Sequence, residues 1–409
     1  MSTATTHSNN KPSWRGGTTK QSANRIPKLR FNEFEGDWNT KKIGEIYRVN
    51  AGGDINENHV SQIKTEKYQY PIYANAKKEK GFYAYSDIYN VEPNTITISG
   101  RGAHLGIAHA RDHRFYPIVR LLVLKPLNDE DIHFSECAIN RLNLFIESTG
   151  VPQLTAPQIS GYKISFPSLP EQQKIAAFLS AVDEKIQQLT KKKALLEQYK
   201  KGVMQQLFSG KLRFKDENGN PYPDWEEKRL GEVGKIVSGL TYSPDDINEE
   251  GVLVLRSSNV HGRQVTFDDN VYVNIVDNKF NPVEENDILI CVRNGSKRLI
   301  GKNALIKGKA IGVAFGAFMT VYRSSSNLFL FHYFDTVDYK KEVHKNLGAT
   351  INSINGSDLK KFMIPYPSQP EQQKIANYLS AIDKKIETVN TQIEKTQHFK
   401  KGLLQQLFV

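Results

Sequence analysis

The chain of 409 residues contains only two cysteines, Cys137 and Cys291, and they lie in different halves of the sequence. Neither belongs to a CxxC or mixed Cys/His cluster, so a disulfide framework and a structural zinc site are both unexpected. We expect both thiols to be buried as small apolar side chains. No apolar stretch reaches the roughly 18 residues that cross a bilayer, and the N-terminus lacks the basic-then-apolar order of a signal peptide. These absences predict a cytoplasmic protein without a membrane anchor.

The common signatures of catalysis are also missing. Gly295–Asn303 resembles a phosphate-binding loop, but its glycines enclose five residues instead of four, and Asn replaces Ser or Thr. Asn220-Pro-Tyr-Pro223 lacks the Pro-Pro-aromatic order of an amino-methyltransferase motif. Asp224, Glu226 and Lys228 are too close together for a nuclease site, and the histidines show no HExxH spacing. We therefore expect no catalytic residue, no metal site and no cofactor site in this chain.

Positive charge is what the composition has in excess. The chain carries 55 Lys and Arg against 44 Asp and Glu, which gives a formal net charge of +11. This sign favours a polyanionic partner, with nucleic acid first and an acidic protein surface second. The apolar content of 39% is that of an ordinary globular protein, and the length leaves room for about two to three domains.

The most informative feature is an internal repeat with an offset of 200 residues. Residues 170–186 are identical to 370–386 at 13 of 17 positions, whereas the sequences before each copy are far less alike. Both of these preceding segments nevertheless open on Leu-Arg-Phe followed by a tryptophan, within 29–38 and 212–225. The repeat unit is therefore a whole domain followed by a helix.

Each repeated segment has the signals of a long helix. Ser168-Leu-Pro-Glu171 and Ser368-Gln-Pro-Glu371 fit capping boxes, and Gly210 fits a C-terminal stop. Apolar residues then recur with heptad spacing, which predicts two helices of about 55–60 Å that pair as an antiparallel coiled coil with pseudo-two-fold symmetry. The expected seam residues are Ile175, Leu179, Val182, Ile186, Leu189, Leu196, Val203, Leu207, Ile375, Leu379, Ile382, Ile386, Val389, Ile393, Leu403 and Leu407.

Polar residues on these helices leave alternatives open. Lys193, Lys200, Thr396 and Lys400 interrupt the seam, where they can fix the register or extend past it to solvent. A helix that only covers its own domain is the alternative to pairing, although the length and the recurrence argue against it. Other repeated residues are expected to point outward as either a solvated face or a docking surface for a partner present twice: Gln172, Gln173, Lys174, Gln205 and Gln206.

The repeat also sets the domain boundaries. The expected segments are a disordered tail (1–28), a first domain (29–167), a spacer helix (168–210), a second domain (211–367) and a C-terminal spacer helix (368–409). Short β-branched runs between turn residues predict mixed α/β domains with mostly antiparallel sheets, so the expected fold class is α+β. The clearest runs are 95–99, 118–124, 252–255, 288–290 and 318–322.

Several loops combine cations, amides and glycine, the groups that contact base edges and phosphates. Arg101 and Arg293 are the strongest candidates, because both closely follow an expected strand in comparable positions. Each residue taken singly fits an ordinary solvated loop better. The full set of candidate DNA-contacting residues is Tyr73, Asn75, Lys77, Arg101, His104, Thr155, Gln158, Arg256, Ser257, Asn259, Arg293, Asn294, Ser296, Lys297, Arg298, Asn352 and Asn355.

The pattern resembles the specificity subunit of type I restriction–modification systems. The features that carry this resemblance are Pro170-Glu-Gln-Gln-Lys-Ile-Ala176, its copy at 370–376, the helices ending in Leu-Phe, and the openings at Trp38 and Trp225. The resemblance covers nearly everything from residue 29 to residue 409. It implies that each variable domain is a target-recognition domain for one half of a bipartite double-stranded DNA sequence, and that the helices set the gap.

The resemblance also implies partners. Two methyltransferase (M) subunits that bind S-adenosylmethionine would dock on the repeated helices. Two restriction/translocase (R) subunits, which use ATP and Mg, would complete the complex, and the chain itself would be non-catalytic. Two alternatives stay open: a stand-alone DNA methyltransferase or nuclease with degenerate motifs, and a coiled-coil scaffold without a DNA role.

Overall fold

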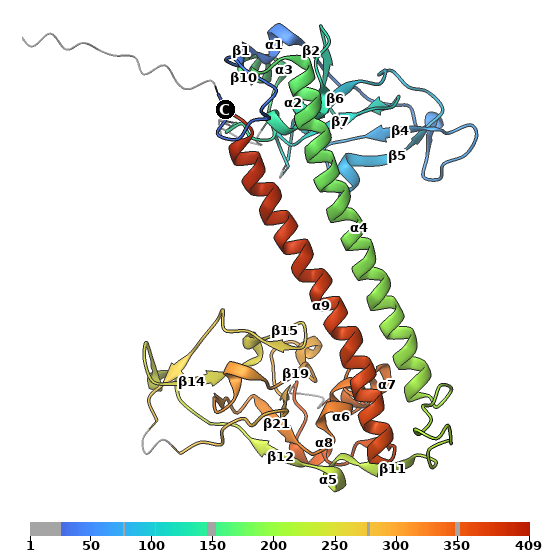
Figure 1. The fold of residues 1–409 in the computed structure, drawn as a ribbon, viewed down its shortest axis with the longest axis vertical. Helices are drawn as coiled ribbons and strands as arrows, with labels where there is room; N and C mark the ends of the chain where they lie inside the picture. The colour runs from blue at the N-terminus through green and yellow to red at the C-terminus, as the bar shows by residue number, and fades with distance from the viewer. Residues whose placement is uncertain (1–25, 77, 103, 145–152, 276–278, 348–351) are drawn as a thin grey trace, which may run out of the picture. The chain divides into compact units, whose positions relative to one another are not determined.

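The computed structural model describes residues 26–76, 78–102, 104–144, 153–275, 279–347 and 352–409 (Figure 1). By internal contacts the chain forms two compact units: unit 1 comprises Met1–Gln187 and Ile393–Val409, and unit 2 comprises Gln188–Gln392. The boundary therefore cuts through both repeated helices, and each unit keeps a segment of each. Of the expected tail, residues 1–25 lie outside the described part of the chain.

Unit 1 contains two four-stranded sheets and one two-stranded sheet, with orders β2-β9-β6-β7, β3-β5-β4-β8 and β1-β10. Its strands are β1 (Asn39–Lys42), β2 (Tyr47–Ala51), β3 (Val60–Ser61), β4 (Tyr70–Tyr73), β5 (Phe82–Ser86), β6 (Thr95–Ile98), β7 (Ala108–Arg111), β8 (Tyr116–Pro117), β9 (Leu122–Pro126) and β10 (Lys163–Phe166). Its short helices are α1 (Ile43–Ile46), α2 (Ile132–Ile139) and α3 (Ala156–Gly161). The strands pair antiparallel except for β4 and β8.

Unit 2 repeats this topology with orders β12-β21-β18-β19, β13-β17-β14-β20 and β11-β22, and adds a hairpin, β15-β16. Its strands are β11 (Glu226–Arg229), β12 (Lys235–Ser238), β13 (Ile247–Asn248), β14 (Val252–Leu255), β15 (Val260–His261), β16 (Gln264–Val265), β17 (Tyr272–Val273), β18 (Ile288–Cys291), β19 (Asn303–Leu305), β20 (Ala314–Phe315), β21 (Met319–Arg323) and β22 (Met363–Tyr366). Its short helices are α5 (Leu230–Val233), α6 (Asn327–Tyr333), α7 (Val337–Lys345) and α8 (Gly356–Leu359). Here too one pair, β14 and β20, is parallel. The α+β expectation is confirmed.

Most of the expected strands lie where the sequence placed them. The runs at 95–99, 252–255, 288–290 and 318–322 correspond to β6, β14, β18 and β21 to within one residue at most ends. The run at 118–124 is wrong in its first half, because Val119 and Arg120 have φ angles of 53° and 56°. That left-handed turn is costly for a β-branched residue and prevents strand pairing before Leu122.

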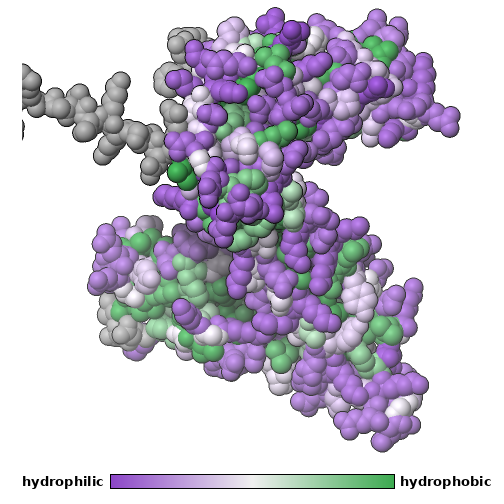
Figure 2. Space-filling view, turned by 45° about the horizontal axis from the view of Figure 1, so that its top comes forward, coloured by the Kyte–Doolittle hydropathy of each residue, from purple (hydrophilic) through white to green (hydrophobic). Residues whose placement is uncertain are grey.

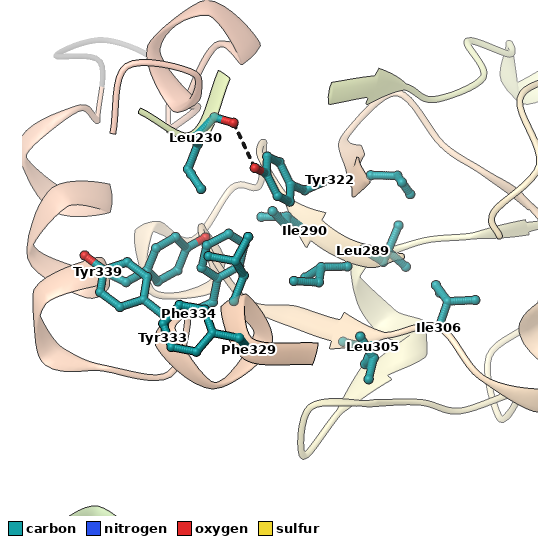
Figure 3. Packing of buried hydrophobic residues seen from close by; sticks show 14 of the residues in the cluster. Leu230, Leu289, Ile290, Leu305, Ile306, Tyr322, Phe329, Tyr333, Phe334 and Tyr339 are labelled. Atoms are coloured by element: carbon teal, nitrogen blue, oxygen red, sulfur yellow. Dashed lines mark hydrogen bonds between the residues drawn. The ribbon is translucent and has the colours of Figure 1, made fainter. Parts of the chain in front are cut away.

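Aromatic residues organise the core of unit 2 (Figure 3). Tyr322 on β21 is fully buried, and its hydroxyl donates to the carbonyl oxygen of Leu230 at 2.8 Å. This bond gives the buried hydroxyl a partner that it would otherwise lack. Phe334 and Tyr339 stack with their ring centroids 4.5 Å apart. The sheet and the helices α6 and α7 thus share one hydrophobic cluster.

The repeated Trp openings and Leu-Phe helix ends meet in equivalent aromatic clusters. In unit 1 Trp38 lies 5.6 Å from Phe134, and Phe134 stacks on Phe408 at 5.1 Å between centroids. In unit 2 the ring of Phe329 lies 5.5 Å from that of Phe208 and 6.3 Å from that of Trp225, measured between centroids. In each unit the two motifs therefore pack on one central phenylalanine, Phe134 in unit 1 and Phe329 in unit 2.

The two long helices are α4 (Leu169–Phe208) and α9 (Gln369–Gln406). The left-handed φ of +71° at Gly210 ends α4 as expected. Every expected seam residue is buried or half-buried. In unit 2 Lys200 contacts Asp383 and Lys193 donates to Asn390, both at 2.6 Å, so the helix segments run antiparallel.

The lysines in the seam bind side chains of the facing helix segment instead of extending to solvent. In unit 1 Lys400 reaches both carboxylate oxygens of Asp183, at 2.6 and 2.7 Å. This pair is the counterpart, at the 200-residue offset, of Lys200 with Asp383 in unit 2. A helix slipped by one heptad would break these pairs, so they help to specify the register.

A buried ion pair holds the start of each long helix. The Arg30 guanidinium donates to both carboxylate oxygens of Glu171 at 2.8 and 2.7 Å, and Arg213 does so to Glu371 at 3.1 and 2.7 Å. The two glutamates are 1% and 0% exposed. The expected capping boxes are therefore wrong: the carboxylates are committed to arginines, and within the described residues the Ser368 hydroxyl has no hydrogen-bond partner.

The same arginines close the loop at each domain opening. Arg30 also donates to the carbonyl oxygens of Glu35 and Gly36, and Arg213 donates to those of Tyr222 and Pro223. Trp225 Nε1 adds a third bond to Glu371, at 2.9 Å. Each Leu-Arg-Phe segment is thus fixed to a helix start.

The segments before these arginines also contact helix ends. Leu29 donates its backbone N–H to the carbonyl oxygen of Gln406 at 2.9 Å, and Leu212 does so to Gln206 at 3.1 Å. The second contact lies within one continuous stretch of chain, whereas the first joins segments from opposite ends of the sequence. The two junctions therefore have the same geometry with different connectivity.

Some repeated residues expected to point outward are buried. Gln172 is 2% exposed, and its amide nitrogen donates to the carbonyl oxygen of Pro167, as that of Gln372 does to Pro367. Lys174 pairs with Glu33 at 3.1 Å. The outward orientation of Gln172 is therefore wrong, since its side chain covers backbone groups at the helix start. Gln173, Gln205 and Gln206 are exposed.

Both cysteines are free, with Cys291 buried and Cys137 half-buried. Burial raises the pKa of the Cys137 thiol to about 12. No helix in the described part of the chain is both long and apolar enough to cross a bilayer.

Replacing Glu371 with alanine removes the buried carboxylate of Arg213, which keeps only the exposed Asp224 at 3.5 Å, and leaves Trp225 without its acceptor. Removing one partner of a buried pair costs about 3–5 kcal/mol, and we expect a loss of that order in the free energy of unfolding, measured by urea denaturation. The matched control is Glu33→Ala, whose pair with Lys174 is exposed on both sides, so its loss should have a much smaller effect. Equal losses for the two variants would contradict a special role for the buried pair.

Unit 2 should lose stability in mild acid through His332. Burial, followed by the charges of Lys200 and Arg263, lowers the pKa of His332 to about 3. The Asp383 carboxylate is 3.8 Å away and already bound to Lys200, so it does not offset this effect. Because the unfolded state takes up the proton first, stability is complete above the unfolded pKa and falls as the pH drops below it.

We expect the free energy of unfolding of unit 2 to fall by about 1 kcal/mol between about pH 7 and pH 5.5 because of His332, measured by urea denaturation. His332→Gln should flatten the pH dependence in that window. An unchanged slope in the variant would assign the effect to other groups.

Candidate nucleic-acid interface

Two loops occupy equivalent places in the two units. Loop 1 (residues 101–106, of which 103 is not described) joins β6 to β7, and loop 2 (residues 293–301) joins β18 to β19. Each ends on a left-handed glycine, Gly106 at φ +86° and Gly301 at φ +80°. The Gly106 N–H donates to the carbonyl oxygen of Ser99 at 2.7 Å, and the Gly301 N–H donates to that of Cys291 at 2.9 Å. Glycine is required there because other residues rarely adopt this conformation.

Arg101 and Arg293 begin these loops in matching positions. Arg101 forms a β-bridge with Gln153, and Arg293 forms one with Ser353. Leu154, which follows Gln153, donates its N–H to the carbonyl oxygen of Gly100 at 2.8 Å. Ile354, which follows Ser353, donates its N–H to that of Val292 at 2.9 Å. Gln153 and Ser353 are related by the 200-residue offset. The equivalence of the two arginines is thus fixed by hydrogen bonds.

The two arginines keep their charge available. The Arg101 guanidinium donates to Gln153 Oε1 at 3.1 Å, and the Arg293 guanidinium lies 5.6 Å from the Phe318 ring. Among the described residues neither arginine has a carboxylate partner. Loop 2 adds exposed side chains at Lys297 and Arg298. An unpaired cation on a loop can bind a phosphate or the acceptor edge of guanine.

In unit 1 other candidates support the loop instead of being free for a ligand. Asn75 accepts the Gly100 N–H at 2.8 Å and donates to the Val119 carbonyl oxygen at 2.6 Å, which fixes the segment leading into Arg101. Tyr73 is only 7% exposed, with its hydroxyl bonded to His113 at 2.9 Å. Its burial leaves little of the side chain accessible, and a direct base contact by Tyr73 stays a prediction.

The remaining unit 1 candidates divide further. Thr155 and Gln158 bond reciprocally at the start of α3, with Thr155 N–H donating to Gln158 Oε1 at 2.8 Å. Their side chains therefore cap a helix. His104 is half-buried, and Lys77 lies outside the described residues.

In unit 2 a hydrogen-bond network shapes loop 2. Asn294 donates to the Ser257 hydroxyl at 3.0 Å, and Asn352 donates to the Gly295 carbonyl oxygen at 2.9 Å. Ser296 is exposed beside them and donates its N–H to Asn294 at 3.0 Å. These amides hold the loop backbone in place, while the side chains of Lys297 and Arg298 remain exposed to solvent.

The other unit 2 candidates are largely committed. Asn259 is fully buried and binds three backbone groups, those of Arg256, Thr266 and Asp269, and a DNA contact by its side chain stays a prediction. Arg256 pairs with the Asp269 carboxylate at 3.0 Å. Asn355 is exposed at the start of α8, and its side chain makes no capping bond.

Two contributors were not anticipated from the sequence. Gln153 holds Arg101, and Phe318, which is 59% exposed, flanks Arg293. The only signal for Gln153 is its place opposite Ser353 in the repeat. Over the described residues no group of three or more metal-ligating side chains occurs. Hydrophilic residues dominate the face shown in Figure 2, with hydrophobic residues in smaller areas.

The chain thus consists of two units of one topology, each with an arginine-headed loop whose arginine has no carboxylate partner among the described residues. The chain matches the family described as type I restriction modification DNA specificity domain over residues 35–198 and again over 222–397. It therefore belongs to this family, and the resemblance noted from the repeated helices is confirmed.

Individual relatives agree with this assignment. The chain is 28% identical over 332 residues to the putative type I restriction enzyme MjaX specificity subunit of Methanocaldococcus jannaschii, a match that covers 78% of this chain and 72% of the relative. It is 37% identical over 138 residues to the putative type I specificity subunit S.MpnORF89P of Mycoplasma pneumoniae, which covers 34% of this chain and only 41% of that relative.

The fold is similar to a crystal structure of a type I restriction-modification S subunit from M. genitalium. The TM-score is 0.61 at 18% identity, and the match covers 94% of this chain and 99% of that one. At this level of identity the likeness concerns the fold.

Proposed function

We propose that this chain is the DNA-recognition subunit of a type I restriction–modification complex and that each unit reads one half of a bipartite target. The observation that carries the proposal is the equivalence of Arg101 and Arg293, each at the head of a loop on a shared scaffold. Family membership supports a role in specificity. The loops differ in length and composition, which is what reading two unlike half-sites requires.

Each loop would combine two kinds of contact. Arg101 and Arg293 would donate to guanine O6 and N7 in the major groove, where one guanidinium can make both bonds. Lys297 would bind a backbone phosphate, a kind of contact that positions a protein on DNA without reading its sequence. The half-buried amides that brace the loops would act indirectly, by reducing the ordering cost of binding.

The paired helix segments would set the gap between the half-sites. The register-specifying pairs Asp183–Lys400 and Lys200–Asp383 support this, because a spacer measures distance only if its helices cannot slide. The exposed repeated glutamines, among them Gln173 and Gln205, offer the same surface twice and would dock two M subunits.

The chemistry would belong to the partners. S-adenosylmethionine would bind the M subunits, ATP and Mg would bind the two R subunits, and this chain would contribute no catalytic group. The complex would act in the cytoplasm on double-stranded DNA.

Arg101→Ala and Arg293→Ala should each relax recognition in one half-site. Losing a bidentate guanine contact costs about 1–3 kcal/mol of discrimination at that base pair. Methylome sequencing of cells that express the variant with its M subunits would show which half-site has changed. The control is Lys297→Ala, a phosphate contact whose loss should weaken methylation without changing the sequence. Changes in both halves from one arginine variant would contradict the modular assignment.

A matched seven-residue insertion in both helices should lengthen the gap. The insertion goes between Leu189 and Leu196 in α4 and between Ile386 and Ile393 in α9, because Lys193 faces Asn390. Seven residues add about 10 Å, which corresponds to about three base pairs at 3.4 Å each. Methylome sequencing should return the same half-sites with a longer gap.

The control inserts the heptad in α4 alone. The Lys–Asp pairs at the two ends of the seam then cannot form in one register, so the variant should lose stability in urea denaturation. An unchanged gap in the doubly extended protein would refute the spacer role.

A further inference from the structure

Unit 2 contains a partly open cleft of about 340 Å³ that the sequence patterns did not predict. Its walls come from the tip of the β15–β16 hairpin, the end of loop 2, and α7. The residues that matter most are Arg263, Arg298, Asp335, Tyr339 and Lys340. The hairpin that forms one wall has no equivalent among the described strands of unit 1.

The hairpin tip is built to present an arginine. Gly262 and Arg263 have φ angles of +54° and +64°, which close the two-residue turn between β15 and β16. The Arg263 guanidinium donates to the Phe331 carbonyl oxygen and lies 3.9 Å from the centre of the Phe331 ring. A non-glycine residue at this φ is uncommon and is maintained here by those contacts.

Positive charge dominates the cleft. Its lining includes the cations Arg263, Arg298, Lys302 and Lys340 and a single carboxylate, Asp335. Asp335 is already shared, at 3.7 Å from the Arg263 guanidinium and 3.1 Å from Lys340 Nζ. Within the described residues Arg298 is exposed and has no ion-pair partner. The excess charge therefore favours an anionic ligand.

Tyr339 lines the same cleft and carries a buried, unsatisfied hydroxyl. Tyr339 is 2% exposed and stacks on Phe334 (Figure 3), and among the described residues its hydroxyl has no hydrogen-bond partner. Burial raises the pKa of Tyr339, which keeps the group protonated and hence a donor. A buried donor without an acceptor is costly and calls for one. A ligand oxygen would supply it.

We propose that this cleft binds a phosphoryl group and that the group belongs to the backbone of DNA held by loop 2. Arg298 is part of both the cleft and loop 2, so the cleft begins where the loop headed by Arg293 ends. The inference rests on the proposed function of loop 2. It adds a phosphate contact in one unit only, so the two halves of a target would be held with unequal strength.

The experiment is a salt titration of duplex DNA binding by the full chain, using a duplex without a target site. Arg298→Ala should weaken binding several-fold and lower the slope of log K against log salt by about one, because one phosphate contact is lost. Tyr339→Phe should weaken binding with no change in slope, since it removes a hydroxyl and no charge. The matched control is Lys341→Ala, an exposed lysine of α7 outside the cleft, which should leave both quantities unchanged.

Thermal unfolding separates folding from binding. Without DNA, Tyr339→Phe should unfold at or above the temperature of the parent chain, because it removes an unsatisfied donor. A lower unfolding temperature would show that the hydroxyl has an internal role and would overturn its part in the site.

Free inorganic phosphate tests the other source of a phosphoryl group. If phosphate stabilises the parent chain but not Arg298→Ala, and DNA binding is equal in both, the DNA assignment is overturned. If Arg298→Ala and Tyr339→Phe both bind DNA like the parent, the cleft proposal fails while the proposed function stands. Absence of any salt-dependent DNA binding by the parent chain would instead sink the proposed function.

Discussion

Two buried arginine–glutamate pairs anchor the architecture of this chain. In each unit one guanidinium reaches both oxygens of a glutamate that is almost fully removed from solvent, Glu171 in unit 1 and Glu371 in unit 2. Such a pair repays its desolvation only when its hydrogen bonds are complete. The backbone carbonyls at each domain opening provide those extra bonds, so the first turn of a long helix, an opening loop and a tryptophan cluster become one rigid joint.

The joint explains why the repeated residues are repeated. The arginine binds the glutamate and the opening loop, and the buried glutamine binds the backbone just before the helix. Changing any one of them alone leaves a polar group without its partner. The loops farther along each unit are not bound by this constraint. They share the strand that leads into them, the arginine that heads them and the glycine that ends them, while their length and the rest of their charge are free to differ.

The helices were predictable because heptad spacing and terminal signals act within a short stretch of sequence. Most strands were predictable for the same reason. The capping boxes were wrong because nothing local reveals that Glu171 meets Arg30, a residue 141 positions away. Gln172, Tyr73 and Asn259 were assigned to surfaces by their polarity, whereas their partners are backbone groups and side chains from other elements.

By itself the sequence determined the duplication, the two long helices, the positive charge and the family, since each of these is written in composition or in spacing. Tertiary structure decided which positions correspond across the divergent parts. Arg101 and Arg293 do not share the 200-residue offset of the helices, because the segments before them differ in length. Only the bridges to Gln153 and Ser353 show them to be equivalent. The cleft of unit 2 likewise exists only after folding, because a hairpin tip, a loop end and a helix from separate parts of the chain meet there.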